Sequence, residues 1–233
     1  MYERDNTYPV PLAASATASF LPKVYGWMTA GLALTAMASV FTLSSEGLLQ
    51  LIFGNRLVFY GLIIGELGLV IAMSAAINRI SSLTATLMFL LYSALNGVTF
   101  ASIFLVYTQS SIASTFLVAS GTFAAMSLFG YATKRDLAGW GSFLFMGLIG
   151  IIIASLVNLF LHSAMITWIT SYLGVFIFVG LTAYDTQKLK RIGAGGFADD
   201  ESRKKAAILG ALTLYLDFIN LFLMLLRIMG NRR

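Results

Sequence analysis

The stretch Ala206–Met229 reads AAILGALTLYLDFINLFLMLLRIM. About 20 apolar helical residues are enough to span a hydrocarbon core of roughly 30 Å, so this stretch can cross a bilayer. An aspartic acid, Asp217, lies at its middle. A charged aspartate at the centre of a spanning helix costs about 2.5–3.5 kcal/mol on insertion scales, so a chain seldom keeps one without a use. The sequence therefore predicts a spanning helix with a functional carboxyl group.

The polar and small residues of this stretch fall on one side of the expected helix. Spacings of three and four residues place them on a single stripe: Gly210, Thr213, Asp217, Asn220, Met224 and Arg227. The opposite faces carry Leu, Ile and Phe. Because the stripe must face protein or water and not lipid, we expect this helix to lie at the centre of a bundle.

Composition indicates a membrane protein. Of the 233 residues, 58% are hydrophobic and 11% are charged, whereas a soluble domain is nearer half apolar and a quarter charged. The chain has no cysteine, and its one histidine is His162. Disulfides, thiol redox chemistry and multi-histidine metal centres are therefore excluded, and we expect no cofactor. The fold class predicted is an all-α polytopic membrane protein.

Seven spans can be delimited by hydropathy. They are about Val24–Leu43, Leu57–Ile77, Leu83–Val106, Ile112–Tyr131, Gly141–Leu161, Ala164–Asp185 and Ala206–Met229. Residues 1–22 are predicted to form an N-terminal tail without the features of a cleaved signal peptide. Residues 23–233 form the transmembrane domain. The one long connection, about 186–205, contains a glycine-rich centre and is interpreted as a solvated, mobile cytoplasmic loop.

The basic residues predict the orientation. Of the 15 Lys and Arg residues, eleven fall on the side of the N-terminus, and the other four are Arg56, Arg227, Arg232 and Arg233. By the positive-inside rule the N-terminus is cytoplasmic and the C-terminus lies outside. The formal net charge of +5 is therefore a signal of topology, and we expect no nucleic-acid partner.

Two aspartates could form a titrating pair. Asp185 ends the sixth span in GLTAYDTQKLK, and Asp217 lies roughly 18 Å along the seventh at 1.5 Å per residue. They meet if the sixth helix continues through Gln187 or the seventh begins outside the membrane plane. Such a pair would share a proton and sense pH, and when fully ionised it could attract a calcium ion. The alternatives are a solvated Asp185 beside Lys188 and a neutral, hydrogen-bonded Asp217.

Other polar residues within the spans could line a pore or a polar core: Glu66, Asn96, Asn158, Thr213 and Asn220. Glu66 is the most costly to bury and so the most expected to matter. Asparagines within spans commonly form hydrogen bonds between helices. At the cytoplasmic end of the second span, Arg79 could extend to the interface or pair with Asp185.

The segments GLTAYDTQKLK and LGALTLYLDFINLFLMLLRIMG resemble the Bax inhibitor-1 family, also called TMBIM or LFG, and most closely its bacterial branch. The resemblance covers about Lys23 to the C-terminus. It implies six helices packed around the seventh, an inner-membrane location and a pH-sensitive calcium leak, with cytoprotective roles in eukaryotes. It also implies that the family's aspartate pair corresponds to Asp185 and Asp217.

The same resemblance implies a latch in which an arginine at the end of the second span bonds the sixth-span aspartate. Here Ala76-Ile77-Asn78-Arg79 supplies the single candidate, Arg79. The leading hypothesis is a non-enzymatic, pH-sensitive calcium or cation leak channel. In it, protonation of the aspartate pair weakens the contact with Arg79 and opens a cytoplasmic gate.

Two alternatives belong to other classes. An intramembrane aspartyl protease is disfavoured because no GxGD motif surrounds Asp217 and Pro9, Pro11 and Pro22 all precede the first span. A serine protease would need a GxSxG motif, which is absent. A non-transporting regulator that binds membrane proteases or other membrane proteins through the tail Met1–Pro22 is compatible with the sequence.

Overall fold

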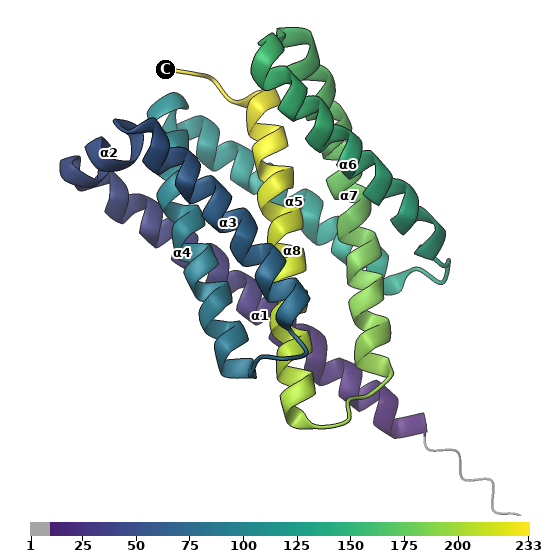
Figure 1. Ribbon diagram of the computed structural model, residues 1–233. Coiled ribbons are helices and arrows are strands. Elements are labelled where there is room, and N and C mark those ends of the chain that lie inside the picture. The colour runs from purple at the N-terminus through teal and green to yellow at the C-terminus, as the bar shows by residue number, and fades with distance from the viewer. Residues whose placement is uncertain (1–9) are drawn as a thin grey trace, which may run out of the picture.

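The computed structural model describes the chain from residue 10 to residue 233, and its side chains from residue 19 onward. In this part the chain is helical (Figure 1). The helices are α1 (Val10–Leu43), α2 (Glu46–Phe53), α3 (Arg56–Ala76), α4 (Ser82–Val106), α5 (Gln109–Ala132), α6 (Ala138–Leu161), α7 (Ala164–Ala194) and α8 (Asp200–Met229). Seven of them, all but α2, are long and apolar enough to cross a membrane. The predicted fold class, an all-α polytopic membrane protein, is confirmed.

Helix α8 is the centre of the bundle (Figure 1). Over the most apolar 18 residues of each helix, 67% of the residues are buried in α8, whereas 6% are buried in α3 and 11% in α6. Helices α1, α4, α5 and α7 pack directly against α8, while α3 packs mainly on α4, and α6 on α7. Of the six spans that surround α8, four therefore contact it directly and two lie further out.

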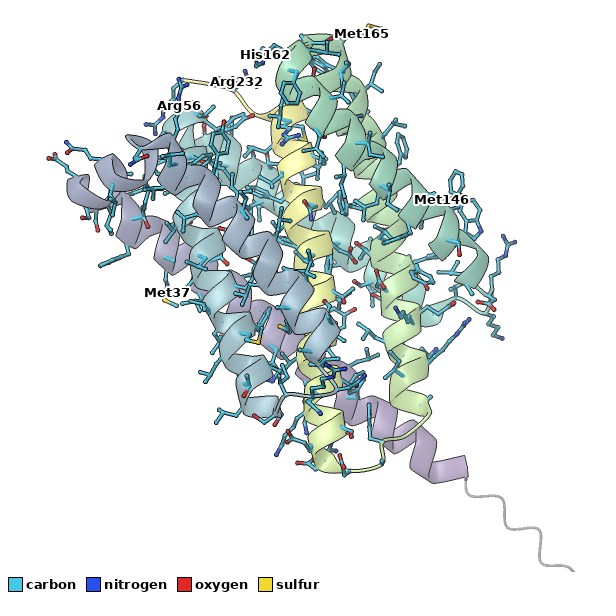
Figure 2. All side chains as sticks on the ribbon, in the orientation of Figure 1. Met37, Arg56, Met146, His162, Met165 and Arg232 are labelled. Atoms are coloured by element: carbon cyan, nitrogen blue, oxygen red, sulfur yellow. The ribbon has the colours of Figure 1, made fainter. Side chains whose placement is uncertain are left out.

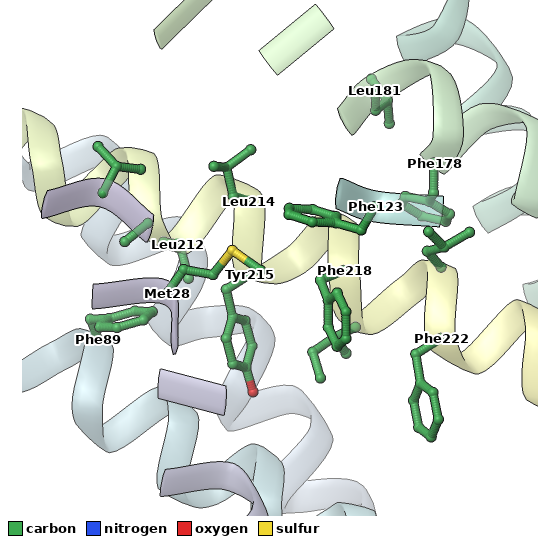
Figure 3. Close-up of a cluster of buried hydrophobic side chains, with 14 of the residues drawn as sticks. Met28, Phe89, Phe123, Phe178, Leu181, Leu212, Leu214, Tyr215, Phe218 and Phe222 are labelled. Atoms are coloured by element: carbon green, nitrogen blue, oxygen red, sulfur yellow. The ribbon is translucent and has the colours of Figure 1, made fainter. Parts of the chain in front are cut away.

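Aromatic side chains fix α8 against α4 and α5 (Figure 3). Tyr215 is fully buried, and its ring meets Phe89 at 5.9 Å and Tyr92 at 5.7 Å between centroids, both edge to face. Phe218 meets Phe123 in the same way at 5.5 Å. Such pairs contribute about 0.5–1.5 kcal/mol each beyond the burial of their area. This side of α8 is thus held rigidly.

Two glycines allow helix backbones to approach closely. A Cβ at Gly97 in α4 would lie against the backbone oxygen of Thr35 in α1. A Cβ at Gly130 in α5 would lie against the backbone oxygen of Ala183 in α7. Small residues at helix contacts are the usual means of close packing in membranes.

The predicted loop at 186–205 is wrong in its extent. Helix α7 continues to Ala194 and α8 begins at Asp200, so the connection is residues 195–199. Gln187 is buried and binds the α5–α6 connection: its Nε2 donates to the Arg135 oxygen and its Oε1 accepts from the Leu137 N–H, both at 2.9 Å. These contacts, together with a run free of proline, keep this segment helical.

Capping defines where α8 begins. The Asp199 carboxylate accepts a hydrogen bond from the Ser202 N–H at 2.6 Å. This bond lowers the pKa of the Asp199 carboxyl group, as expected for an anion at a helix N-terminus.

The N-terminal boundaries also differ from expectation. Of the tail predicted at 1–22, residues 1–9 lie outside the described residues, and α1 already begins at Val10 and contains Pro22. Helix α2 was not predicted, because its eight residues are too short to register as a span. Its N-cap is Ser45, whose side chain accepts from the Leu48 N–H.

The end of the bundle that holds the C-terminus is closed by a short strap. Tyr107, between α4 and α5, forms an antiparallel bridge with Arg232, and the Thr108 N–H donates to the Asn231 oxygen at 3.1 Å. Figure 2 shows Arg56 and Arg232 at this end, together with His162. The C-terminal tail is thereby fastened to the α4–α5 connection.

Candidate functional site

Asp185 of α7 and Asp217 of α8 lie together inside the bundle. Their exposed fractions are 8% and 5%, and a hydrogen bond joins the two carboxyl groups. Two carboxylates offer only acceptors, so a hydrogen bond between them requires that one of the pair is protonated. Among the described residues no other side chain or N–H donates to Asp217 Oδ2. The pair is therefore the natural place for a proton that can be exchanged.

The length of two helices brings the aspartates to the same depth. Helix α7 continues to Ala194 beyond Asp185, and α8 begins at Asp200, well before Asp217. The sixth span thus continues through Gln187, which is one of the two extensions that were expected to let the aspartates meet. The hydroxyl group of Thr186, next to Asp185, forms a hydrogen bond with the hydroxyl group of Tyr25 in α1 at 3.2 Å. This bond connects the same part of α7 to a third helix.

A cavity of about 940 Å³ opens beside the pair, between α3, α6, α7 and α8. Its apolar walls come mainly from α3 and α6. Its main ionisable and polar groups are Glu66, Asp185, Lys188, Asp217, Asn220 and Arg227. The polar stripe of α8 therefore faces this cavity, from Thr213 through Met224 to Arg227. Gly210 instead packs against Leu189 of α7.

A second cavity, of about 420 Å³, lies between α3, α4 and α8 toward the strapped end. It shares Glu66, Asn220 and Arg227 with the first cavity and reaches Tyr107. Polar groups thus line a path from Asp185 in α7 to the α4–α5 connection, along the C-terminal half of α8.

Glu66 lies at the junction of these cavities in a hydrogen-bonded network. It is 9% exposed and accepts from Asn96 Nδ2 at 3.4 Å and from Thr99 Oγ1 at 3.1 Å. The Tyr215 hydroxyl donates to Asn96 Oδ1 at 3.3 Å and bonds with Thr35 Oγ1 at 2.7 Å. The network joins α1, α3, α4 and α8, which satisfies groups that would be costly in lipid.

Tyr92 also belongs to this network, because its hydroxyl accepts from Asn96 Nδ2 at 3.3 Å. Four members of the network were missed from the sequence: Thr35, Tyr92, Thr99 and Tyr215. Thr99 lies three residues after Asn96, a spacing that places both on one helix face and could have indicated it. The tyrosines gave no such signal, because an aromatic residue in a span usually indicates core packing or an interfacial position.

The other predicted residues lie in different settings. Thr213 and Asn220 line the first cavity but donate to their own helix, to Leu209 O at 3.1 Å and Leu216 O at 2.8 Å. Asn158 lies outside both cavities, at the α6–α7 turn, where it donates to Thr167 Oγ1 and accepts from the Ser163 N–H, both at 2.8 Å. Its role here is to join two helices.

Arg79 is not joined to Asp185. Its side chain is exposed in the turn after α3, and within the described chain the ion pairs do not include it. The α3–α4 turn is held by other residues. Glu201 of α8 accepts from the Ser82 N–H at 2.5 Å and from Ser82 Oγ at 2.7 Å, and Lys205 Nζ donates to the Ile80 oxygen at 3.3 Å. In this conformation α8 itself holds the α3–α4 turn, at the end of the bundle opposite the C-terminus.

The site offers oxygens without a closed metal cage. In the described part of the chain no cluster of three or more acidic, histidine or cysteine side chains is arranged to hold a metal ion. Calcium takes six to eight oxygen ligands. The two carboxyl groups line the cavity together with Thr213 and Asn220.

Fold and site together define a polytopic helical membrane protein with a buried carboxyl pair beside a polar path. The model of the family described as "Inhibitor of apoptosis-promoting Bax1" matches residues 17–233. The chain belongs to this family, the Bax inhibitor-1 family, and the resemblance noted in the sequence is confirmed.

Relatives match along nearly their full length. The "Inner membrane protein YbhL" of Escherichia coli (strain K12) is 55% identical over 233 residues, which cover 100% of this chain and 99% of that protein. A protein of Borreliella burgdorferi is 50% identical over 214 residues, 92% of each chain. A protein of Rickettsia prowazekii is 46% identical over 218 residues, 92% of this chain and 90% of that protein.

Proposed function

We propose that the protein is a pH-sensitive calcium leak channel of a bacterial inner membrane, with its N-terminus in the cytoplasm. The observation that carries this proposal is the polar path beside α8. It runs from the aspartate pair through Glu66 and Asn220 to Arg227 in two cavities that share lining residues. A relative 55% identical is named an inner membrane protein, which supports the location.

The aspartate pair is the gate in this proposal. Lys188 lies one turn beyond Asp185 on α7, lines the same cavity and interacts electrostatically with the Asp185 carboxylate. Acid adds a proton to the pair and removes the negative charge opposite Lys188. The cytoplasmic end of α7 is then held less firmly, and the equilibrium shifts toward an open state. Calcium flux accordingly rises as the pH falls.

The test is calcium flux into liposomes that contain the purified protein, measured across a pH series. Wild type is expected to conduct with a pH midpoint, and either Asp185→Asn or Asp217→Asn is expected to abolish that midpoint. Glu46→Gln, an exposed acid-to-amide change on α2, is the matched control and should keep the wild-type profile. A wild-type flux that is the same at neutral and mildly acidic pH would contradict the proposal. If no variant conducts, the role of the aspartates is structural or regulatory.

A further inference from the structure

The first cavity has a side opening at the depth of the bilayer core. Its lateral walls are apolar: Ile63 and Leu67 of α3, and Leu148, Ile152 and Leu156 of α6. Leu67 and Leu156 are 60% and 56% exposed, so the rim of the cavity is open. These residues lie inside two long apolar helices, at least five residues from either helix end. A molecule that enters between α3 and α6 therefore comes from the membrane and not from water.

The floor of the cavity presents hydrogen-bond acceptors. Asp217 Oδ2 is buried and receives no hydrogen bond from another described group, which is costly in a low dielectric. The Thr213 hydroxyl donates its hydrogen to Leu209 O, and Asn220 Nδ2 donates one of its two hydrogens to Leu216 O, both within α8. The side-chain oxygens of Thr213 and Asn220 therefore remain to accept. The headgroup that suits this floor is one that only donates, and an ammonium group offers three donors and no acceptor.

The charges around the cavity are compatible with an ammonium headgroup. Asp185 and Asp217 lie together in the floor, with Glu66 on the α3 side. The cations Lys188 and Arg227 also line the cavity: Lys188 lies one turn beyond Asp185 on α7, and Arg227 lies ten residues beyond Asp217 on α8. An ammonium at the pair forms charge-assisted hydrogen bonds, which are about twice as strong as neutral ones.

We propose that this cavity binds a single-chain lipophilic amine that enters from the bilayer between α3 and α6. The alkyl chain lies on the apolar walls and the ammonium group binds Asp217 and Asp185. A volume of about 940 Å³ falls within the range of roughly 300–1,000 Å³ that small-molecule pockets occupy. Binding at this site does not depend on whether the protein conducts calcium.

The experiment uses the full-length protein in liposomes and a dodecylamine that carries a photoreactive diazirine on its chain. Irradiation is expected to label peptides that contain the α3 and α6 wall residues. Unlabelled dodecylamine should compete for this labelling, whereas dodecanol and dodecyl sulfate should not. Butylamine, which does not partition into the membrane, should also fail to compete. Labelling that spreads over the outer surface of the bundle, or that dodecanol suppresses as well as dodecylamine does, would overturn the proposal.

Two pairs of variants sharpen the test. Asp217→Asn is expected to reduce wall labelling about tenfold, with Glu46→Gln unchanged. Ser155→Phe, which fills the α6 wall of the cavity, should also reduce it, while Ile153→Phe on the exposed lipid side of the same helix should not. Equal labelling in Asp217→Asn and wild type would overturn the role of the carboxyl pair. The competition series in wild type decides the matter even if a variant fails to fold. Because labelling needs no ion flux, a protein that fails to conduct calcium can still pass this test.

Discussion

Asp217 is buried at the middle of the most buried helix, and its carboxyl group is hydrogen-bonded to that of Asp185. Removing one partner of such a pair leaves the other carboxyl without its shared proton. In the function that we propose, the pH response therefore originates at this pair. The first prediction identifies the cation that interacts with this pair, Lys188 or Arg79.

Arg79→Ala is expected to leave the pH midpoint of calcium flux unchanged. The Arg79 side chain is exposed and is not paired with Asp185, whereas Lys188 interacts with that carboxylate from one turn away. Lys188→Ala, by contrast, is expected to shift the midpoint. Flux measurements across a pH series on both variants check this. A shifted midpoint in Arg79→Ala would instead support a latch that forms in another conformation.

Asp136, in the connection between α5 and α6, should titrate below the ordinary range. The Ala138 N–H and the Arg191 guanidinium both lower the pKa of its carboxyl group, and the N–H contributes most. Because this pKa is lowered in the folded state, the stabilisation is present above the ordinary aspartate pKa and is lost as the pH falls through the lowered value. Carboxyl NMR on wild type and Arg191→Gln checks this. The substitution should raise the pKa only in part, and a complete return would contradict the leading role of Ala138.

The residues of the site differ in how far the sequence could predict them. Asp185, Asp217 and Glu66 stood out because an acid in a span is costly, and the structure brings all three to one cavity. The partners of Glu66 could not be predicted, because hydroxyl groups of Tyr and Thr are common in spans and their meeting depends on how four helices pack. Asn158 carried the same signal as Asn96, yet it joins the α6–α7 turn.

At the scale of helices, the contact of α5 with α7 depends on a glycine. Gly130→Ala would place a Cβ against the Ala183 backbone oxygen, which cannot move aside as a side chain end could. We expect a loss of about 1–3 kcal/mol of stability, seen as a lower melting temperature of the purified protein. Gly121→Ala in the same helix meets nothing within 4 Å and should melt at least as high as wild type. Equal melting temperatures of the two variants would show that the backbones of α5 and α7 can move apart at little cost.

Helix α8 also holds the start of α4. Glu201→Ala removes the acceptor for the Ser82 N–H and hydroxyl, so hydrogen exchange of the first-turn amides of α4 is expected to rise several-fold. Asp200→Ala is the matched control, because Asp200 pairs with Arg203 and Lys204 of its own helix. Mass-spectrometric exchange of peptides around residue 82 provides the measurement. If both variants exchange alike, the contact does not stabilise α4.

Helix existence was predictable and helix length less so. The seven spans follow from hydropathy. A segment that crosses lipid must satisfy its own backbone hydrogen bonds, and a helix does so within one apolar stretch. The ends of α7 and α8 extend into polar sequence, where hydropathy carries no signal. There the contacts of Gln187 and the cap at Asp199 decide the boundaries.

For the whole molecule, orientation can be tested because the chain has no cysteine. Ser44→Cys, after α1, and Ala198→Cys, between α7 and α8, each introduce one exposed thiol. In intact cells a membrane-impermeant maleimide is expected to react with the Cys at position 44 and not with the one at position 198, which should react only after lysis. The opposite pattern would reverse the proposed topology.

The central position of α8 has a consequence for biogenesis. It is the seventh of the seven spans in chain order, so six helices enter the bilayer before their common core exists. Until it arrives, α4 presents Asn96 and α3 presents Glu66 to a groove without its filling helix. During that interval Asn96 Oδ1 lacks the hydrogen bond that it accepts from the Tyr215 hydroxyl of α8 in the complete bundle. A chain whose synthesis stops before α8 would consequently leave the polar side chains that face α8 uncovered, and membrane quality control can recognise such a chain.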